Sequence, residues 1–301
     1  MSLYRFKTFT TSYYFPTISK GQEYMYGLYS AYGSLPSKVL WWLFRNVGLV
    51  RHLFAVSEDK VDFPLQTIRQ LDGTNCKMAF NMGSPGVEQK ISILGWDKTK
   101  RNPFFAKFSQ SERAKELTRN EIRLYTLLAE TGLTPKLYSY KECDEGIYMK
   151  AECLNGKRPD SMELTDKIIN LALQLSKFHL SDANENSNGL KTSLSHGDFC
   201  PWNILIVDGK MRLIDWELAA ERSLGYDIFT YICQIALLFY PEKDLSKVID
   251  ENHDALQKYF SATGVSDSTP YLKAFAKEKA DYELEKGHAD LAEKFRALLS
   301  Y

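Results

Sequence analysis

The chain has 301 residues, of which 44% are hydrophobic, and its 38 Asp and Glu residues balance its 38 Lys and Arg residues. This size and composition fit one large or two small globular domains. The neutral balance, and the lack of a basic stripe with interleaved aromatic residues, argue against nucleic acid as a partner.

The cysteine pattern and the first residues of the chain bear on the cellular compartment of the protein. The five cysteines show no C-x-x-C spacing, which argues against a zinc site and for a reducing cytoplasm. The first twenty residues lack a continuous apolar stretch, so we expect no secretory signal. Together these features predict a cytoplasmic protein.

Residues 1–60 hold 14 of the 40 aromatic residues of the chain. Residues 36–56 are predicted to be helical, but they are too polar to span a bilayer. One side of this region carries five apolar residues: Val39, Leu40, Leu43, Phe44 and Val47. Two alternatives remain open. The region packs its aromatic side chains on a small lobe or at a dimer contact, or it is an amphipathic helix at a membrane surface, with Trp41 and Trp42 at the interface.

A short glycine-containing segment follows, in which Gly83 and Gly86 lie within Asn81 to Glu88. Glycine lets backbone amides approach phosphate closely, so the segment could cover a nucleotide. The pattern G-x-G-x-x-G is absent, however, and Gly-Ser-Pro-Gly is equally an ordinary hairpin turn.

The next strand and helix carry a candidate ion pair. Residues 103–108 alternate as in a strand and place Lys107 on the face opposite to Phe104, Ala106 and Phe108. Ser111 offers a helix N-cap, and the helix is expected to stop at Gly132. Glu121 falls on the apolar stripe of this helix, beside Leu117, Leu124 and Leu128. Because a buried carboxylate without a partner is costly, we predict that Glu121 pairs with Lys107.

The most informative segment runs from Ser195 to Glu217. Two apolar runs flank Asp208-Gly209, a pair that favours the type I′ turn of a two-residue hairpin. With that turn Asn203 faces Ile214, so Asn203 and Asp215 emerge within one rung of each other. Asp198 lies five residues before Asn203, in a loop that ends near the same point.

These three side chains suit phosphoryl transfer. Magnesium prefers oxygen ligands, and Asn203 and Asp215 supply them beside the phosphates of a substrate. Asp198 is then free to accept a proton from an attacking hydroxyl or to orient that hydroxyl.

The segment His196-Gly-Asp-Phe-Cys-Pro-Trp-Asn203, followed by Leu-Ile-Asp215-Trp-Glu, resembles the catalytic segment of the aminoglycoside phosphotransferase and choline kinase family. The resemblance covers roughly residues 75–240 and implies a protein-kinase-like fold. It implies that Asp198 is the catalytic base, that Asn203 and Asp215 hold the metal, and that His196 supports the loop. Protein kinases place Arg before the catalytic Asp and Phe-Gly after the metal Asp, whereas this chain has Gly197 and Trp216.

The same resemblance gives roles to other residues. Lys107, held by Glu121, would contact the α- and β-phosphates of the nucleotide. The strand within 146–156 resembles the hinge of the family, where the backbone of Glu152 and Leu154 would pair with adenine. Asp227, near the start of an apolar helix, would steady the catalytic loop.

Two further expectations concern packing. His179 lies beside the apolar stripe of a helix over 164–180, so we expect a core histidine with a hydrogen bond. Residues 281–301 are predicted to form a solvated helix with an apolar stripe of Leu284, Leu291, Phe295 and Leu298.

We therefore predict a bilobal α+β protein-kinase-like fold. Its parts would be an aromatic-rich extension (1–60), a nucleotide-binding lobe (61–152), and a helical catalytic and substrate-binding lobe (153–301). The predicted activity is phosphorylation of a small-molecule hydroxyl with magnesium and ATP or GTP.

The acceptor and the oligomeric state remain open, and other classes of function are possible. Within the resembled family the acceptor could be an aminoglycoside, an amino alcohol or a sugar. The main alternative is a catalytically weak kinase-like module that binds nucleotide. A protein kinase is a third possibility, but no A-P-E motif follows Asp215.

Overall fold

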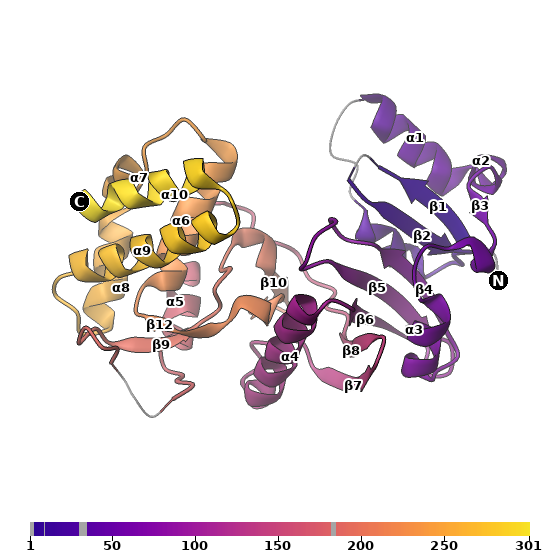
Figure 1. Ribbon diagram of the computed structural model, residues 1–301, viewed down its shortest axis with the longest axis horizontal. Helices are drawn as coiled ribbons and strands as arrows, with labels where there is room; N and C mark the ends of the chain where they lie inside the picture. Colours follow the sequence, from indigo (N-terminus) through magenta and orange to yellow (C-terminus); the bar gives the residue numbers. More distant parts are fainter. Residues whose placement is uncertain (1–2, 9, 30–34, 182–184) are drawn as a thin grey trace. The chain divides into compact units, whose positions relative to one another are not determined.

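The computed structural model describes residues 3–8, 10–29, 35–181 and 185–301. The chain divides into two compact units, Met1–Leu154 and Asn155–Tyr301. The first is rich in strands and the second is mostly helical (Figure 1). The α+β class predicted from the sequence is confirmed.

The first unit is built on one eight-stranded antiparallel sheet with the order β3-β1-β2-β4-β5-β6-β8-β7. Its strands are β1 (Leu3–Lys7), β2 (Ser12–Pro16), β3 (Ala55–Val56), β4 (Cys76–Asn81), β5 (Lys90–Asp97), β6 (Asn102–Ser109), β7 (Leu137–Cys143) and β8 (Gly146–Glu152). Its helices are α1 (Leu35–Asn46), α2 (Gly48–His52), α3 (Leu65–Asp72) and α4 (Glu112–Leu127). Strands from residues 1–60 therefore continue the sheet that carries Lys107.

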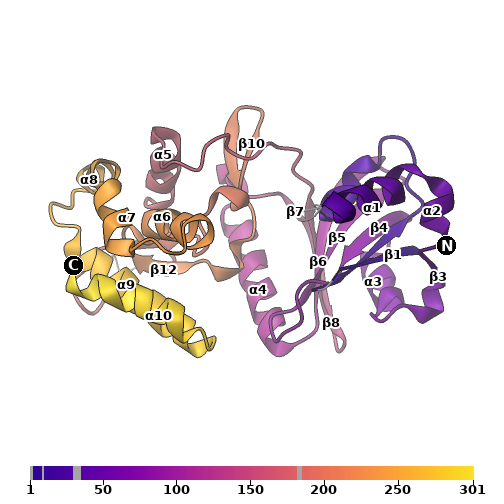
Figure 2. The same cartoon turned by 90° about the horizontal axis from the view of Figure 1, so that it is seen from above.

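The sheet separates two hydrophobic cores, with α1 and α3 on opposite sides (Figure 2). Leu65 and Ile68 of α3 pack under one face, together with Phe104, Ala106 and Phe108 of β6. Because side chains alternate along a strand, Lys107 points to the other face, where α4 lies. The strand alternation predicted from the sequence is thus confirmed.

The face of α1 that packs against the sheet matches the predicted one only in part. Trp41 and Phe44 are buried against Phe6 and Phe15, whereas Val39 and Leu40 are 49% and 42% exposed. The predicted apolar side of residues 36–56 is therefore wrong for Val39 and Leu40 and confirmed for Phe44. Large aromatic rings gain more from burial than the smaller aliphatic side chains, so they decide which face of the helix turns inward.

The second unit contains six helices among its described residues and two small antiparallel ribbons. The helices are α5 (Asp166–Leu175), α6 (Tyr226–Phe239), α7 (Leu245–Glu251), α8 (His253–Ala262), α9 (Thr269–Glu285) and α10 (Ala289–Arg296). The ribbons pair β9 (Thr192–Ser195) with β12 (Ala220–Ser223), and β10 (Ile204–Val207) with β11 (Lys210–Leu213). Phe229 of α6, Phe260 of α8 and Phe275 of α9 form an aromatic core between the helices.

The predicted single helix over 281–301 is wrong, because the chain breaks between α9 and α10. Gly287 has φ +81°, a left-handed conformation that ends α9, and the amide of His288 donates to the carbonyl of Glu283. After the break α10 folds back beside α9 (Figure 2). Leu284 is 48% exposed, whereas Phe295 and Leu298 are buried.

Candidate active site

The hairpin of β10 and β11 has the predicted register. Val207 pairs with Lys210 across Asp208 and Gly209, whose φ values of 49° and 76° are those of a type I′ turn. At the open end the amide of Ile214 donates to the carbonyl of Asn203 at 3.0 Å. The hairpin therefore brings Asn203 and the residue before Asp215 to one rung.

Asn203 holds Asp198 directly. Its Nδ2 donates to the backbone carbonyl of Asp198 at 2.9 Å and to Asp198 Oδ2 at 2.8 Å. The thiol of Cys200 donates to Asp198 Oδ1 at 3.4 Å. Asp198 is half-buried and Asn203 is buried. The carboxylate therefore has a fixed orientation, and the amide oxygen of Asn203 is the atom of that side chain that suits a cation.

His196 connects the loop to the end of the hairpin. It is fully buried, its Nε2 lies 3.0 Å from the carbonyl of Ile214, and its Nδ1 lies 3.3 Å from the amide of Asp198. A carbonyl only accepts and an amide only donates, so Nε2 carries the proton and Nδ1 accepts. The ring also packs against Trp216, with centroids 4.8 Å apart. His196 thus fixes Asp198 relative to the strand that leads to Asp215.

Asp227, in the first turn of α6, anchors the loop from behind. Its carboxylate accepts from the hydroxyl of Ser195 at 2.7 Å, from the amide of His196 at 2.8 Å and from the amide of Gly197 at 3.1 Å. Gly197 has φ +85°, and a Cβ at this position would lie 2.3 Å from the carbonyl of Leu218. Only glycine fits this close approach of two backbone segments.

Asp215 adopts a left-handed backbone conformation, with φ 69° and ψ 56°. This conformation is uncommon outside glycine, and Asp tolerates it better than most residues. The buried indole of Trp216 donates to the carbonyl of Leu213 at 3.0 Å, which holds the turn in place. Such backbone strain is often found at functional sites.

The donor set near this turn fits a hard divalent cation. Asn203 offers an amide oxygen and Asp215 a carboxylate, and both are ligand types that magnesium accepts. A carboxylate oxygen of Glu217 lies within 4.8 Å of one of Asp215. The sequence argument gave Glu217 no role. Its position two residues after Asp215, across a tight turn, could have indicated a second carboxylate at this site.

The predicted Lys107–Glu121 ion pair is formed in the first unit. Lys107 Nζ lies 2.7 Å from Glu121 Oε2, and the two side chains are 7% and 0% exposed. The helix that carries Glu121 begins at the predicted cap, where Ser111 Oγ accepts from the amide of Ala114 at 3.1 Å. The cap and the register of α4 together bring Glu121 to the lysine on β6.

Gly83 and Gly86 lie in the loop between β4 and β5, next to the strand that pairs with β6. A Cβ on Gly83 would lie 2.6 Å from the carbonyl of Lys90, so this position requires glycine. The requirement comes from the closing of the hairpin itself. It is compatible with the ordinary turn and with the nucleotide loop, the two alternatives that the sequence left open.

Glu152 is the last residue of β8, and Leu154 ends the first unit. The amide of Glu152 donates to the carbonyl of Lys136 at 2.8 Å, and its side chain accepts from the amide of Lys136 at 3.1 Å. An adenine contact through Glu152 would therefore use an atom other than its amide.

The predicted residues thus fall into two groups, each described within its own unit. The first group contains Gly83, Gly86, Lys107, Glu121, Glu152 and Leu154, and the second contains Asp198, Asn203 and Asp215. Hydrogen bonds link Asp198 to Asn203, and His196 connects them to the approach to Asp215.

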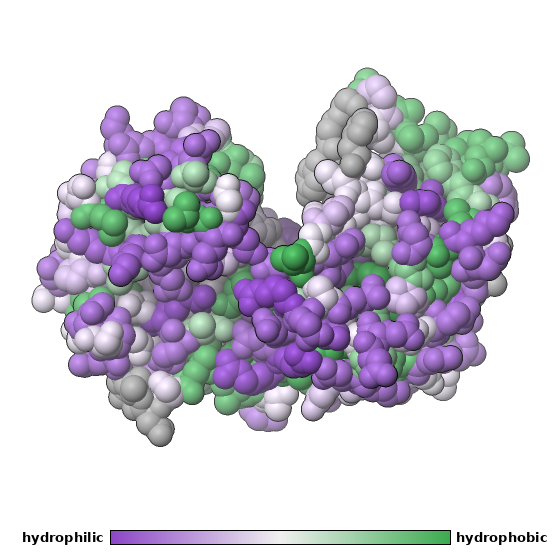
Figure 3. Space-filling view, in the orientation of Figure 1, coloured by the Kyte–Doolittle hydropathy of each residue, from purple (hydrophilic) through white to green (hydrophobic). Residues whose placement is uncertain are grey.

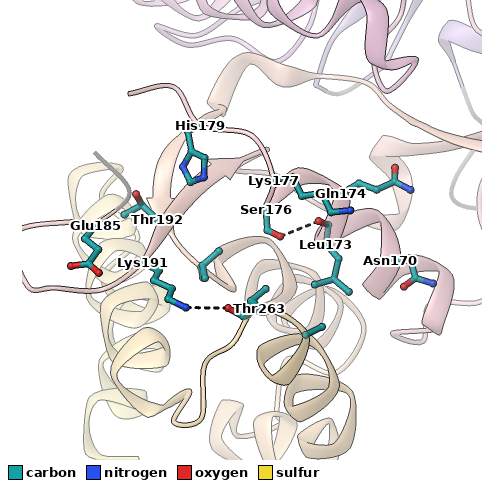
Figure 4. A pocket seen from close by; sticks show the side chains of 12 residues that line it. Asn170, Leu173, Gln174, Ser176, Lys177, His179, Glu185, Lys191, Thr192 and Thr263 are labelled. Atoms are coloured by element: carbon teal, nitrogen blue, oxygen red, sulfur yellow. Dashed lines mark hydrogen bonds between the residues drawn. The ribbon is translucent and has the colours of Figure 1, made fainter. Parts of the chain in front are cut away.

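A separate cavity of about 810 Å³ in the second unit contains none of these residues (Figure 4). It lies between the C-terminal parts of α5 and α8 and includes His179, which is exposed and hydrogen-bonded to Glu221 Oε1 at 3.1 Å. The prediction of a core histidine is therefore wrong: α5 ends at Leu175, so the ring leaves the helical stripe before it can be buried.

Comparisons with known proteins give a match to one family. Residues 158–262, about a third of the chain, match the model of the phosphotransferase enzyme family. The family resemblance inferred from the sequence is thereby confirmed. The matched segment contains Asp198, Asn203 and Asp215, the hairpin and α6.

Solved structures of phosphotransferases share the fold. A thermostable mutant of aminoglycoside phosphotransferase APH(4)-Ia, in ternary complex with ADP and hygromycin B, is 11% identical, with a TM-score of 0.51 over 80% of this chain and 98% of that one. A provisionally named fructosamine-3-kinase from Haemophilus somnus 129PT is 14% identical, with a TM-score of 0.50 over 78% of this chain and 95% of that one. The predicted protein-kinase-like fold is confirmed.

Proposed function

We propose that this chain transfers a phosphoryl group from ATP or GTP to a hydroxyl of a small molecule, with magnesium. The observation that carries the proposal is the fixed carboxylate of Asp198, which Asn203 and Cys200 orient within a loop anchored by His196 and Asp227. A carboxylate held in this way can take the proton of an attacking hydroxyl without reorganising. The phosphotransferase family match supports the assignment.

Other residues would bind and orient the nucleotide. Lys107, held by Glu121, would contact the α- and β-phosphates, and the backbone near Gly83 and Gly86 would cover them. Glu152 and Leu154 would contact the base. Asn203 and Asp215 would hold magnesium, which when bound neutralises charge on the phosphates.

The domain roles follow from these assignments. Residues 61–152 would bind nucleotide, residues 153–301 would carry the catalytic loop and the acceptor, and residues 1–60 would be an extension. None of the described helices is long and apolar enough to cross a bilayer. The two neighbours are named as acting on or binding small molecules, and ADP and hygromycin B are bound in one of them. The cysteine pattern and the neutral charge balance support a cytoplasmic small-molecule kinase without a nucleic-acid partner.

A coupled assay of ADP release tests the proposal. The full chain is incubated with Mg–ATP or Mg–GTP and with aminoglycosides, amino alcohols or sugars, and release above the acceptor-free rate is measured. Release that requires an acceptor supports phosphotransfer. Nucleotide binding without acceptor-dependent release would favour the alternative, a catalytically weak nucleotide-binding module.

A further inference from the structure

A second, smaller cavity lies directly beside the catalytic loop, within the second unit. Its volume is about 270 Å³, and Gly197, the neighbour of Asp198, forms part of its wall. The other lining residues come from the β12 region, the start of α6 and α9: Leu218, Arg222, Tyr226, Glu278, Lys279, Asp281, Tyr282 and Glu285. Ligand pockets usually measure about 300–1,000 Å³, so this cavity suits a compact molecule.

Lys279 is the unusual residue in this cavity. Its exposure is only 5%, and its ammonium group has no hydrogen-bond acceptor or carboxylate partner among the described residues. Its contacts are instead with two aromatic rings, because Nζ lies 5.5 Å from the ring centre of Tyr226 and 5.9 Å from that of Tyr282. An ammonium group has three N–H donors, and since Nζ is not among the fully buried atoms that lack a partner, these donors are left to the solvent of the cavity.

The other cation in the cavity, Arg222, is half-buried and shows the contrast. Arg222 Nε lies 2.5 Å from Glu278 Oε1, and another guanidinium nitrogen donates to the carbonyl of Leu218 at 2.9 Å. The charge of Arg222 is therefore matched within the protein. Asp281 and Glu285 are exposed at the cavity, where water screens their charge.

Lys279 shares the wall of the cavity with Gly197, the residue before Asp198. Burial lowers the pKa of its ammonium group, and the Asp198 carboxylate is the next largest influence and opposes that shift. The side chains of Arg222, Cys200 and Glu283 act on Lys279 more weakly. An anionic group bound in the cavity would match the lysine charge and satisfy its donors.

We propose that this cavity binds the phosphate acceptor, and that Lys279 selects a compact acceptor that carries an oxyanion, either a carboxylate or a phosphate, near its hydroxyl. The inference rests on the proposed function for one point only, the identification of the bound compound as the phosphate acceptor. Lys279 is then a specificity-determining residue, and Asp198 remains the residue that takes the hydroxyl proton.

Four compounds with one carbon skeleton test this selection: glycerol, glycerate, glycerol 3-phosphate and 3-amino-1,2-propanediol. Their affinities for the full chain are measured by calorimetry with saturating Mg–AMP-PNP. We expect glycerate or glycerol 3-phosphate to bind roughly tenfold or more tightly than glycerol, since a charge-assisted hydrogen bond contributes at least that much. Comparison of the two anions distinguishes a carboxylate from a phosphate.

The variant Lys279→Met keeps the length of the side chain and removes its charge. It should lose the preference for the anion, whereas Lys277→Met, an exposed lysine on the same helix, should keep it. If Lys279→Met does not fold, as judged by circular dichroism, Lys279→Gln replaces it. Tighter binding of the neutral or amino compound, no difference among the four compounds, or an anion preference that survives loss of the Lys279 charge would overturn the inference.

ADP release with the same compounds separates this inference from the proposed function. Turnover that favours the amino compound would preserve the kinase and remove the anion site. Tight, Lys279-dependent anion binding without ADP release would preserve the anion site and show that the bound compound is not an acceptor.

Discussion

Asp198 is held at three points, and the contacts define what each part of the residue does. Its amide donates to His196, its carbonyl accepts from Asn203, and its carboxylate accepts from Asn203 and Cys200. The backbone contacts fix the position of the residue, and the side-chain contacts fix the direction of the carboxylate. An enzyme gains most from groups that are oriented before the substrate arrives.

Replacing Asp198 should separate catalysis from nucleotide binding. In Asp198→Ala we expect acceptor-dependent ADP release to fall by roughly 10²–10⁴-fold, the usual contribution of a positioned base. The affinity for Mg–ATP, measured by calorimetry, should stay close to that of the wild type. Asp254→Asn, an exposed carboxylate on α8, is the matched control and should turn over normally. Unchanged turnover in Asp198→Ala would remove the proposed mechanism.

Asp215 combines a proposed ligand role with an unusual backbone. Asp215→Asn keeps the tolerance for the left-handed conformation but loses the charge. We expect roughly tenfold or greater loss of affinity for Mg–ATP, since contacts to a charged group contribute that much. Binding of ATP without magnesium should change little. Equal affinity of wild type and variant for Mg–ATP would contradict the ligand role.

Among the elements, the junction of β6 and α4 depends on one buried ion pair. Lys107 and Glu121 are both nearly inaccessible to water, so removal of either side chain breaks a buried ion pair. We expect Lys107→Met or Glu121→Gln to lower the free energy of unfolding by about 3–5 kcal/mol. Urea denaturation monitored by circular dichroism measures this change.

The same helix supplies a control for that experiment. Arg119 of α4 pairs with Glu142 at the surface, where water screens the interaction. Arg119→Met should therefore change the free energy of unfolding far less than Lys107→Met. Equal effects of the two variants would show that the buried pair has no special role. Restored stability in the double variant Lys107→Met and Glu121→Leu would confirm that the cost came from the unpaired charge.

Short-range patterns predicted these elements well. Asp208-Gly209 specifies one type of turn, and that turn fixes the hairpin register. Ser111 marks the start of α4. The strand alternation places Lys107 on the face of the sheet opposite to the core that contains Phe104 and Phe108. Each of these features depends on interactions between residues that are close in sequence.

Other features depend on packing between distant segments, which a single sequence does not reveal. The inward face of α1 is decided by Trp41 and Phe44 meeting strands β1 and β2. The buried position of Lys279 arises where α9 packs against the β12 region. The glycine at position 287 could have predicted the break between α9 and α10. The charge-rich helical pattern continues on both sides of it, however, and therefore favoured a single helix.

At the scale of the whole molecule, the proposed nucleotide contacts and the proposed catalytic loop belong to different units. The first unit contains the Lys107–Glu121 pair, and the second contains Asp198 and its supports. Neither unit alone contains all the residues that the proposed reaction uses. We therefore expect activity only in the full chain.

The surface of the first unit has a separate feature, an exposed hydrophobic patch. Exposed hydrophobic residues gather over α1 and α2, at the upper right of Figure 3. Among them Trp42, Leu49 and Leu53 are 60%, 80% and 81% exposed. Residues 35–56 contain Lys, Arg and His but no Asp or Glu. Since Trp41 is buried, Trp42 is the only one of the two tryptophans that a membrane interface could reach.

Peripheral membrane contact through residues 36–56 therefore stays a prediction, with an anionic lipid surface as the expected partner. Flotation with phosphatidylserine-containing vesicles should recover the protein, and the double variant Leu49→Asp and Leu53→Asp should reduce recovery several-fold. Vesicles of phosphatidylcholine alone serve as the comparison. If the wild-type protein does not float with anionic vesicles, the predicted membrane contact through this surface is wrong.

The thiol beside Asp198 has a practical consequence for anyone handling the protein. Burial raises the pKa of Cys200, and the adjacent carboxylate raises it further, so the sulfur stays protonated at neutral pH. Burial likewise raises the pKa of Cys76 to about 12 and of Cys153 to about 11. Alkylating reagents attack the thiolate, so iodoacetamide should modify Cys200 only when the surrounding loop opens. The rate of that modification, read by mass spectrometry, would then report the opening of the loop without any introduced label.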